Sequence, residues 1–183
     1  MENIEEFILR KIYKYVFPSE PISEDNSFCN LTKSYDWIQT SDISLKSDIP
    51  LEAIQDSISY LLEMEEKARS VNEKISCLKM VYDNINKINE FYFNRMDKSA
   101  DAQIPIFTYI IIKTHPKRFI SNINYLNCFT EGKELGYINM YIKNCLSSIE
   151  YIFSINPEVF NITDKEFNKR CSESMKKFFK KIK

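Results

Sequence analysis

Side chains suited to catalysis are few and scattered in this sequence of 183 residues. The only histidine, His115, lies between Thr114 and Pro116, and no nucleophile motif stands near it. The five cysteines include no Cys-x-x-Cys pair, which indicates reduced thiols and argues against a disulfide framework or a zinc site. Two glycines argue against a phosphate-binding loop of the GTPase type. We therefore expect no covalent enzyme, cofactor or metal site, and a small hydrolase built on His115 is a remote alternative.

One acidic residue stands out by its position. Asp101 lies just before the most apolar run of the chain, Ile104 to Ile112. The run itself could be an inner strand or an inner helix, because its composition and its periodicity do not separate the two. Ser99 as an N-cap, with Asp101 and Pro105 in the first turns, favours a helix, and Pro116 should end it and begin the next one. On this evidence alone, Asp101 is an acid that complements a helix dipole.

The elements around this run predict an all-α domain. Apolar residues recur at helical spacing with polar residues between them, and prolines or polar stretches separate the segments. We expect about eight helices, including the two at the apolar run. The others lie over Ile4 to Tyr15, Ser23 to Ile38, Leu51 to Leu61, Val71 to Tyr92, and Leu135 or Tyr137 to Phe153, with a last helix opened by the capping box Thr163 to Glu166. The segment Thr40 to Pro50 should be a loop, and Glu65 and Glu66 should be solvated charges.

The charge balance excludes several classes of partner. The chain has 25 Lys and Arg against 26 Asp and Glu, so no nucleic-acid surface is predicted. The amino terminus contains no apolar signal region, and no run approaches the length of a membrane span.

The end of the chain, Lys176 to Lys183, is basic and contains interleaved Phe and Ile. It is either a packed amphipathic helix with a solvated lysine face or a weak contact to anionic membranes.

A set of short motifs, in a fixed order, carries a family resemblance. The motifs are Tyr13-Lys14-Tyr15-Val16-Phe17, Trp37-Ile38, Leu62-Glu63-Met64, Lys74-Ile75-Ser76-Cys77-Leu78, Ser99-Ala100-Asp101 with Pro105, Ser121-Asn122-Ile123-Asn124-Tyr125 and Gly136-Tyr137. This set resembles the vacuolar protein sorting nine (Vps-nine) domain, whose members are guanine-nucleotide exchange factors for early-endosomal Rab GTPases of the Rab-five subfamily. The resemblance covers residues 4–167 of a single domain over 1–183, with 168–183 as a basic helix or tail.

The resemblance implies a role for four residues. Asp101 would be a finger that enters the nucleotide site of the GTPase, pairs with its P-loop lysine in place of the β-phosphate and repels that phosphate. Tyr137 would engage the switch region of the GTPase, and Ile104 and Pro105 would shape the groove that receives it. No covalent bond changes in such a reaction. The resemblance also implies a cytoplasmic protein at the periphery of endosomal membranes, and Ser121 and Asn122 should be structural.

Two positions depart from the family pattern. Ala102 stands where the family usually has a second acid after the finger, and Met140 stands where it has a threonine three residues after the signature tyrosine. The first change removes a charge and the second a hydroxyl that could form a hydrogen bond with the partner, so Met140 would bind the GTPase without that bond. The alternative function is therefore a module that binds the GTPase and exchanges its nucleotide weakly or not at all.

Overall fold

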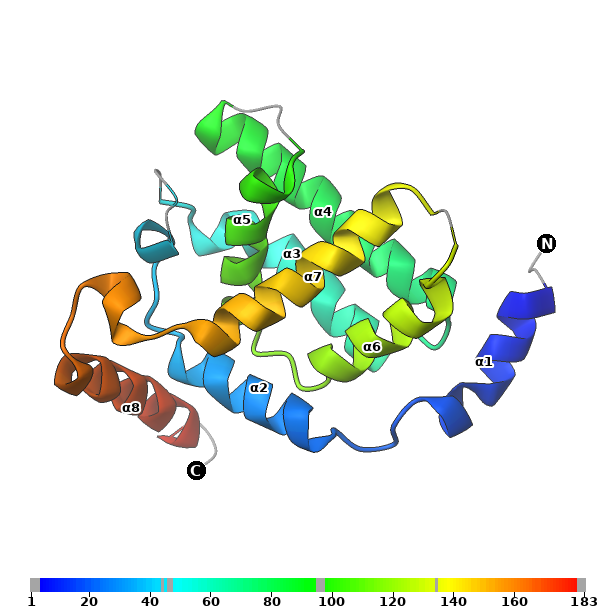
Figure 1. Cartoon of the computed structure of the whole chain (residues 1–183), viewed down its shortest axis with the longest axis horizontal. Helices are drawn as coiled ribbons and strands as arrows, with labels where there is room; N and C mark the ends of the chain where they lie inside the picture. Colours follow the sequence, from blue (N-terminus) through cyan, green and yellow to red (C-terminus); the bar gives the residue numbers. More distant parts are fainter. Residues whose placement is uncertain (1–3, 44, 46–47, 95–97, 134, 181–183) are drawn as a thin grey trace.

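The chain folds as a set of packed α-helices. The computed structural model describes residues 4–43, 45, 48–94, 98–133 and 135–180. Within these ranges it contains no strand, and its helices are α1 (Ile4–Val16), α2 (Ser23–Ser34), α3 (Leu51–Glu66), α4 (Val71–Phe93), α5 (Ala100–Thr114), α6 (Phe119–Thr130), α7 (Tyr137–Ser154) and α8 (Asp164–Lys180), with the short 3-10 helices η1 (Thr40–Ile43) and η2 (Pro157–Phe160) (Figure 1). The predicted all-α class is confirmed.

Helix α5 is the centre of the packing. Every residue from Ile106 to Ile112 is buried, and α5 contacts α2, α3, α4 and α7. Because neighbours surround it on so many sides, its sequence is apolar all round, and the choice between strand and helix is resolved as helix. The helix ends at His115, which has left-handed backbone angles (φ 51°) directly before Pro116.

Helix α6 begins later than the sequence predicted. We expected it to start at Pro116, but its first residue is Phe119. The reason is an acid from another helix: the backbone N–H groups of Lys117 and Arg118 donate to the Glu65 carboxylate of α3, over 3.0 and 2.7 Å. Glu65 is buried, so its assignment as a solvated charge was wrong, and burial raises the pKa of its carboxyl group.

The region after α2 also differs from the prediction. Helix α2 ends at Ser34, so Ile38 lies beyond it, and part of the expected loop after Thr40 forms η1. The Trp37 ring packs edge-on against Phe160 and Phe167, which holds the last part of the chain on this segment. Helix α8 then lies beside α2 (Figure 1).

The predicted start of the last helix is confirmed. The Thr163 hydroxyl accepts a hydrogen bond from the backbone N–H of Glu166 over 3.3 Å, as an N-cap should. Residues 168–180 belong to the same helix, while the last part of the expected basic tail, 181–183, lies outside the described residues. None of the described helices combines the length and the apolar character needed to cross a membrane.

A buried lysine joins α3, α4 and α6. The Lys74 ammonium group donates to the backbone carbonyls of Met64 and Ala68, over 2.9 and 3.0 Å, and to the Asn122 side chain over 2.6 Å. Burial, and next the nearby charge of Arg69, lower the pKa of Lys74 to about 8. Asn122 is therefore structural, as the sequence predicted.

Candidate functional site

Asp101 is exposed in the first turn of α5. Within the described residues its carboxylate forms no hydrogen bond or ion pair, so the structure leaves it free to meet a partner. The helix start that carries it is fixed by its neighbours: the Gln103 backbone N–H donates to the Ser99 carbonyl over 3.1 Å, and the Asn89 side chain donates to the Ala102 carbonyl over 3.2 Å. The positive end of the helix dipole favours a charged carboxylate at this place.

Buried amide groups tie this helix start to two neighbouring helices. The Gln103 side chain is fully buried and donates to Asn86 of α4 over 2.8 Å. The Asn144 side chain of α7 donates to the Gln103 side-chain oxygen over 3.3 Å. Sequence reasoning missed this network, although a glutamine and an asparagine on the apolar faces of two buried helices were a usable signal. The network lies two residues from Asp101 and limits its movement relative to α4 and α7.

Ile104 and Pro105 lie on the same face of α5 as Asp101, because residues three and four apart are neighbours on a helix. Both are half-buried. Pro105 lies inside the helix, five residues after Ala100, and not in the first turn, where its missing N–H would cost little. The N–H that proline lacks would have bonded to the Asp101 backbone carbonyl, so this turn is held instead by side chains from α4 and α7.

Tyr137 is the first residue of α7 and is 70% exposed. It follows Gly136, whose backbone angles (φ 55°, ψ −119°) suit glycine and turn the chain into the helix. One turn further, Met140 is half-buried, and the Tyr141 ring stacks on Tyr82 of α4 with centroids 4.0 Å apart. The exposed tyrosine therefore stands on a helix end that is packed firmly against the core.

The structure brings helices α5 and α7 together, but within the described ranges Asp101 and Tyr137 form no hydrogen bond, ion pair or ring contact with each other. Helices α5 and α7 pack on each other, and Tyr82 lies between Phe107 of α5 and Tyr141 of α7, with centroids 5.2 and 4.0 Å away. Ala102 is only 5% exposed, so its side chain is not part of the surface around Asp101. These residues can offer a carboxylate, a phenol and half-buried apolar groups to a macromolecule.

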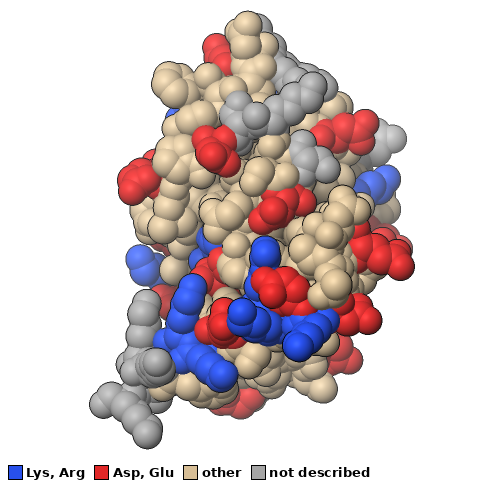
Figure 2. Space-filling view, turned by 90° about the vertical axis from the view of Figure 1, so that its left-hand side faces the viewer, with Lys and Arg blue, Asp and Glu red and all other residues tan. Residues whose placement is uncertain are grey.

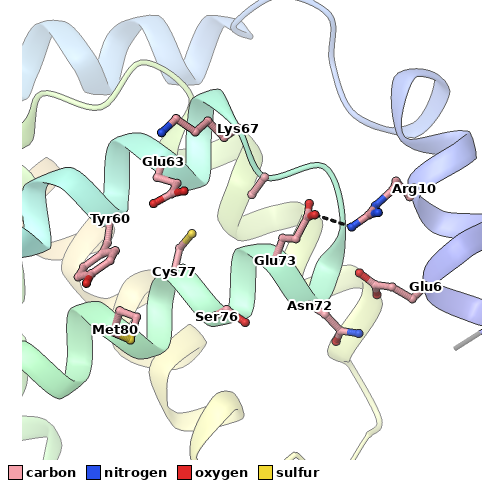
Figure 3. Close-up of a pocket in the computed structure, with 11 residues that line it drawn as sticks. Glu6, Arg10, Tyr60, Glu63, Lys67, Asn72, Glu73, Ser76, Cys77 and Met80 are labelled. Atoms are coloured by element: carbon pink, nitrogen blue, oxygen red, sulfur yellow. Dashed lines mark hydrogen bonds and ion pairs between the residues drawn. The ribbon is translucent and has the colours of Figure 1, made fainter. Parts of the chain in front are cut away.

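A large cleft lies away from these residues. It has a volume of about 730 Å³ and runs between α1, α3 and α4, as Figure 3 shows, and its lining includes Tyr60, Cys77 and Met80. Neither Asp101 nor Tyr137 lines it. The predicted site residues are therefore separate from this cleft, which is of the size that a small ligand needs.

His115 has a structural environment. Its imidazole Nε2 lies 3.2 Å from the Asp36 carboxylate, and its ring meets the edge of Phe178 of α8 with centroids 4.7 Å apart. The hydrogen bond from His115 is the main reason that the pKa of Asp36 is lowered. The Cys29 thiol lies near the His115 backbone carbonyl, not its ring. In the part of the chain that the structure describes, no cluster of three His, Cys, Asp or Glu residues could hold a metal.

Comparison with known proteins finds a sequence match that extends from α3 to η2. The family model of the vacuolar sorting protein 9 (VPS9) domain matches residues 54–157, more than half of the chain. A human protein named Rab5 GDP/GTP exchange factor is 26% identical over 187 residues, covering 94% of this chain and 36% of that protein. Vacuolar protein sorting-associated protein vps901 of Schizosaccharomyces pombe is 21% identical, covering 96% of this chain and 33% of that protein.

A third relative matches a shorter part. Receptor-mediated endocytosis protein 6 of Caenorhabditis briggsae is 30% identical over 95 residues, which is 51% of this chain and 9% of that protein. The chain spans about a third of the length of the first two relatives. The long family match covers the Ser99-Ala100-Asp101 motif and Tyr137. The chain belongs to the vacuolar sorting protein 9 (VPS9) domain family.

Proposed function

We propose that this domain promotes GDP release from a Rab GTPase of the Rab5 subfamily, with Asp101 as the group that enters the nucleotide site. The observation that carries the proposal is the exposed Asp101, which has no partner within the described residues, on a fixed helix start in a chain of this family. The names of the human and fission-yeast relatives, a Rab5 GDP/GTP exchange factor and a vacuolar sorting protein, support the same class of activity.

The mechanism is electrostatic. A small GTPase holds the β-phosphate with a P-loop lysine and Mg²⁺. The Asp101 carboxylate pairs with that lysine and repels the phosphate, so it stabilises the nucleotide-free state relative to the loaded one. Tyr137 contacts the switch region, and Ile104, Pro105 and Met140 line the apolar groove for it. The domain changes only the rate of release, and each 1.4 kcal/mol removed from the barrier gives about a tenfold faster rate.

A second candidate is a module that binds the GTPase with weak or no exchange. It is favoured by the two departures from the family, Ala102 and Met140. The buried Ala102 side chain adds no charge beside Asp101, and Met140 cannot donate a hydrogen bond to the partner. This candidate predicts a stable complex without faster GDP release.

We also propose a weak contact of α8 with anionic endosomal membranes. Lys176 and Lys177 are exposed, and Phe179 is exposed beside them. Figure 2 shows Lys and Arg gathered on the lower part of the face that carries α8, with Asp and Glu among them. The mixture of signs keeps this attraction weak.

The test is the release of a fluorescent GDP analogue from a panel of Rab GTPases of the Rab5 subfamily. The wild-type chain is compared with Asp101→Ala and with a matched control, Asp56→Ala, which changes an exposed acid of α3. We expect wild type and Asp56→Ala to accelerate GDP release equally. With Asp101→Ala, the accelerated rate should be at least tenfold lower. Equal acceleration by Asp101→Ala would refute the role of Asp101. No acceleration by the folded wild type, with capture of nucleotide-free GTPase, would establish the binding module.

A further inference from the structure

A strongly basic cleft lies between α1, the turn from α3 to α4, and the start of α6. Its volume is about 500 Å³. Six of the eleven residues that line it are basic and one is acidic, in a chain whose net charge is −1. The basic residues are Arg10, Lys11, Lys14, Lys67, Arg69 and Arg118.

The one acidic residue of this cleft, Glu73, already has two partners in the cleft. The Arg10 guanidinium donates to the Glu73 carboxylate over 2.5 Å, and the Arg69 backbone N–H donates to it over 2.7 Å. Lys11, Lys14 and Lys67 form no ion pair with any residue that the structure describes. Most of the positive charge in the cleft is therefore not neutralised by carboxylates.

Two guanidinium groups are held in place by neutral partners. Arg69 donates to the backbone carbonyls of Glu66 and Ala68, over 2.5 and 3.0 Å. Arg118 donates to the carbonyls of Pro18 and Ser19. Carbonyls fix the orientation of these groups but leave their net charge intact, although the buried Glu65 offsets part of the charge of Arg118. A preorganised arginine pair of this kind suits a phosphate group.

Two buried groups beneath the cleft respond to this field. The charge of Arg69 is one cause of the lowered pKa of Lys74. Tyr13 lines the cleft and is 8% exposed, and the charges of Arg69 and Arg118 offset part of the rise that burial causes in its pKa. A phosphate group in the cleft would supply the negative charge that these basic residues lack.

The helix that forms one wall of the cleft has an apolar outer ridge. Ile4 and Tyr15 are each 77% exposed, and Ile8 and Ile12 between them are exposed as well, at a spacing that places all four on one side of α1. Arg10, Lys11 and Lys14 follow the ridge on the side of the cleft. An apolar stripe with a basic border is the pattern of a helix that lies in the surface of an anionic bilayer, whereas an apolar protein partner would not need the border.

We propose that α1 and the basic cleft form a membrane-docking surface, in which the ridge enters the bilayer and the cleft binds the phosphorylated headgroup of an anionic lipid. This surface is far from the proposed exchange site. Glu73 at the cleft and Asn89 beside Ala102 are 16 residues apart on α4, which corresponds to about 24 Å. Docking would leave Asp101 and Tyr137 open to a partner, and the proposal does not depend on exchange activity.

The test is sedimentation of the whole chain with vesicles of three compositions: phosphatidylcholine alone, with phosphatidylserine, and with a phosphatidylinositol monophosphate at equal surface charge. The cleft variant is Lys11→Gln with Lys14→Gln and Lys67→Gln. Its control changes three exposed lysines elsewhere, Lys79→Gln, Lys87→Gln and Lys143→Gln. With roughly fivefold affinity per basic residue at a membrane surface, the cleft variant should bind phosphoinositide vesicles about 100-fold more weakly than the control.

Further variants and ligands distinguish a lipid headgroup in a membrane from a free phosphate compound. The ridge variant Ile8→Ser with Tyr15→Ser should lose vesicle binding but keep binding of the soluble inositol phosphate headgroup, measured by calorimetry. Binding of soluble headgroup without any vesicle binding by wild type would show a site for a free phosphate compound and overturn membrane docking. Equal losses in the cleft and control variants would show unspecific attraction and overturn the role of the cleft. Lys176→Glu with Lys177→Glu should change binding little, and a total loss there would move the contact to α8.

Discussion

Replacing Lys74 by methionine should change how the stability of this domain depends on pH. In the folded chain the ammonium group is fully buried among α3, α4 and α6, and its pKa falls from 10.5 to about 8. Because the folded state releases this proton more easily than the unfolded state, the unfolded chain binds more protons between pH 8 and 10.5. The free energy of unfolding must therefore gain a positive contribution from Lys74 as the pH rises through this window.

The size of the effect follows from the shift. A lowering from 10.5 to about 8 means that keeping Lys74 charged costs the folded state about 3 kcal/mol below pH 8. When the proton linkage is integrated from pH 7 to pH 9.5, the free energy of unfolding rises by about 2 kcal/mol, because Lys74 loses its charge in the folded state. Buried tyrosines and cysteines with raised pKa values act in the opposite direction, since their unfolded forms lose protons first. The difference between wild type and variant removes this common part.

The assay is urea unfolding at pH 7.0 and 9.5 of wild type, Lys74→Met and Lys79→Met, an exposed lysine of the same helix. Between the two pH values, wild type and Lys79→Met should gain about 2 kcal/mol relative to Lys74→Met. Parallel changes in all three proteins would refute the reasoning. If Lys74→Met does not fold, the titration of the Lys74 Nζ in wild type by NMR decides, and a midpoint near 10.5 would contradict a buried, costly charge.

Two further predictions concern helix starts. Glu65→Ala should lower the free energy of unfolding by about 2 kcal/mol, because two backbone N–H groups at the start of α6 lose their acceptor, while the exposed Glu66→Ala should stay within about 0.5 kcal/mol of wild type in the same denaturant titration. Gly136→Ala should cost about 1–2 kcal/mol through backbone strain alone, since a Cβ there meets no atom within 4 Å. It should also slow the exchange assay by displacing Tyr137, and an unchanged melting temperature would contradict the strain.

Local sequence patterns predicted the helices, whereas the candidate site residues Asp101 and Tyr137 came from the family resemblance. The local patterns failed where distant residues meet. The N-cap at Thr163 and the helical run after Asp101 depend on neighbours along the chain, so they could be predicted from the sequence. The start of α6 was misplaced because Glu65 is 52 residues from Lys117 in sequence. The same acid was assigned to solvent because nothing in its own helix shows that two unpaired N–H groups lie beside it.

The amides near Asp101 were missed for the same reason. Gln103 is a polar residue in an apolar run, which shows that a partner must exist but not which one. Its partners, Asn86 and Asn144, come from helices on either side in the chain. Lys74 likewise finds its amide partner 48 residues away. Composition and periodicity determine which faces are buried, whereas the pairing of buried polar groups depends on how the helices pack.

The amide residues at the start of α5, Asn89 and Gln103, bear on which of the two candidate functions is better supported. A carboxylate that must enter a partner's nucleotide site loses less entropy on binding when its backbone is already ordered. The first turn of α5 is held by the hydrogen bonds of Asn89 and Gln103, and neither bond uses the side chain of Ala102 or Met140. Ala102 packs inward, and the hydrogen bond at this residue uses its backbone carbonyl, so an alanine here removes a charge but not a support of the helix start that carries Asp101. The ordered first turn of α5 therefore favours an exchange factor with a reduced rate over a module that only binds.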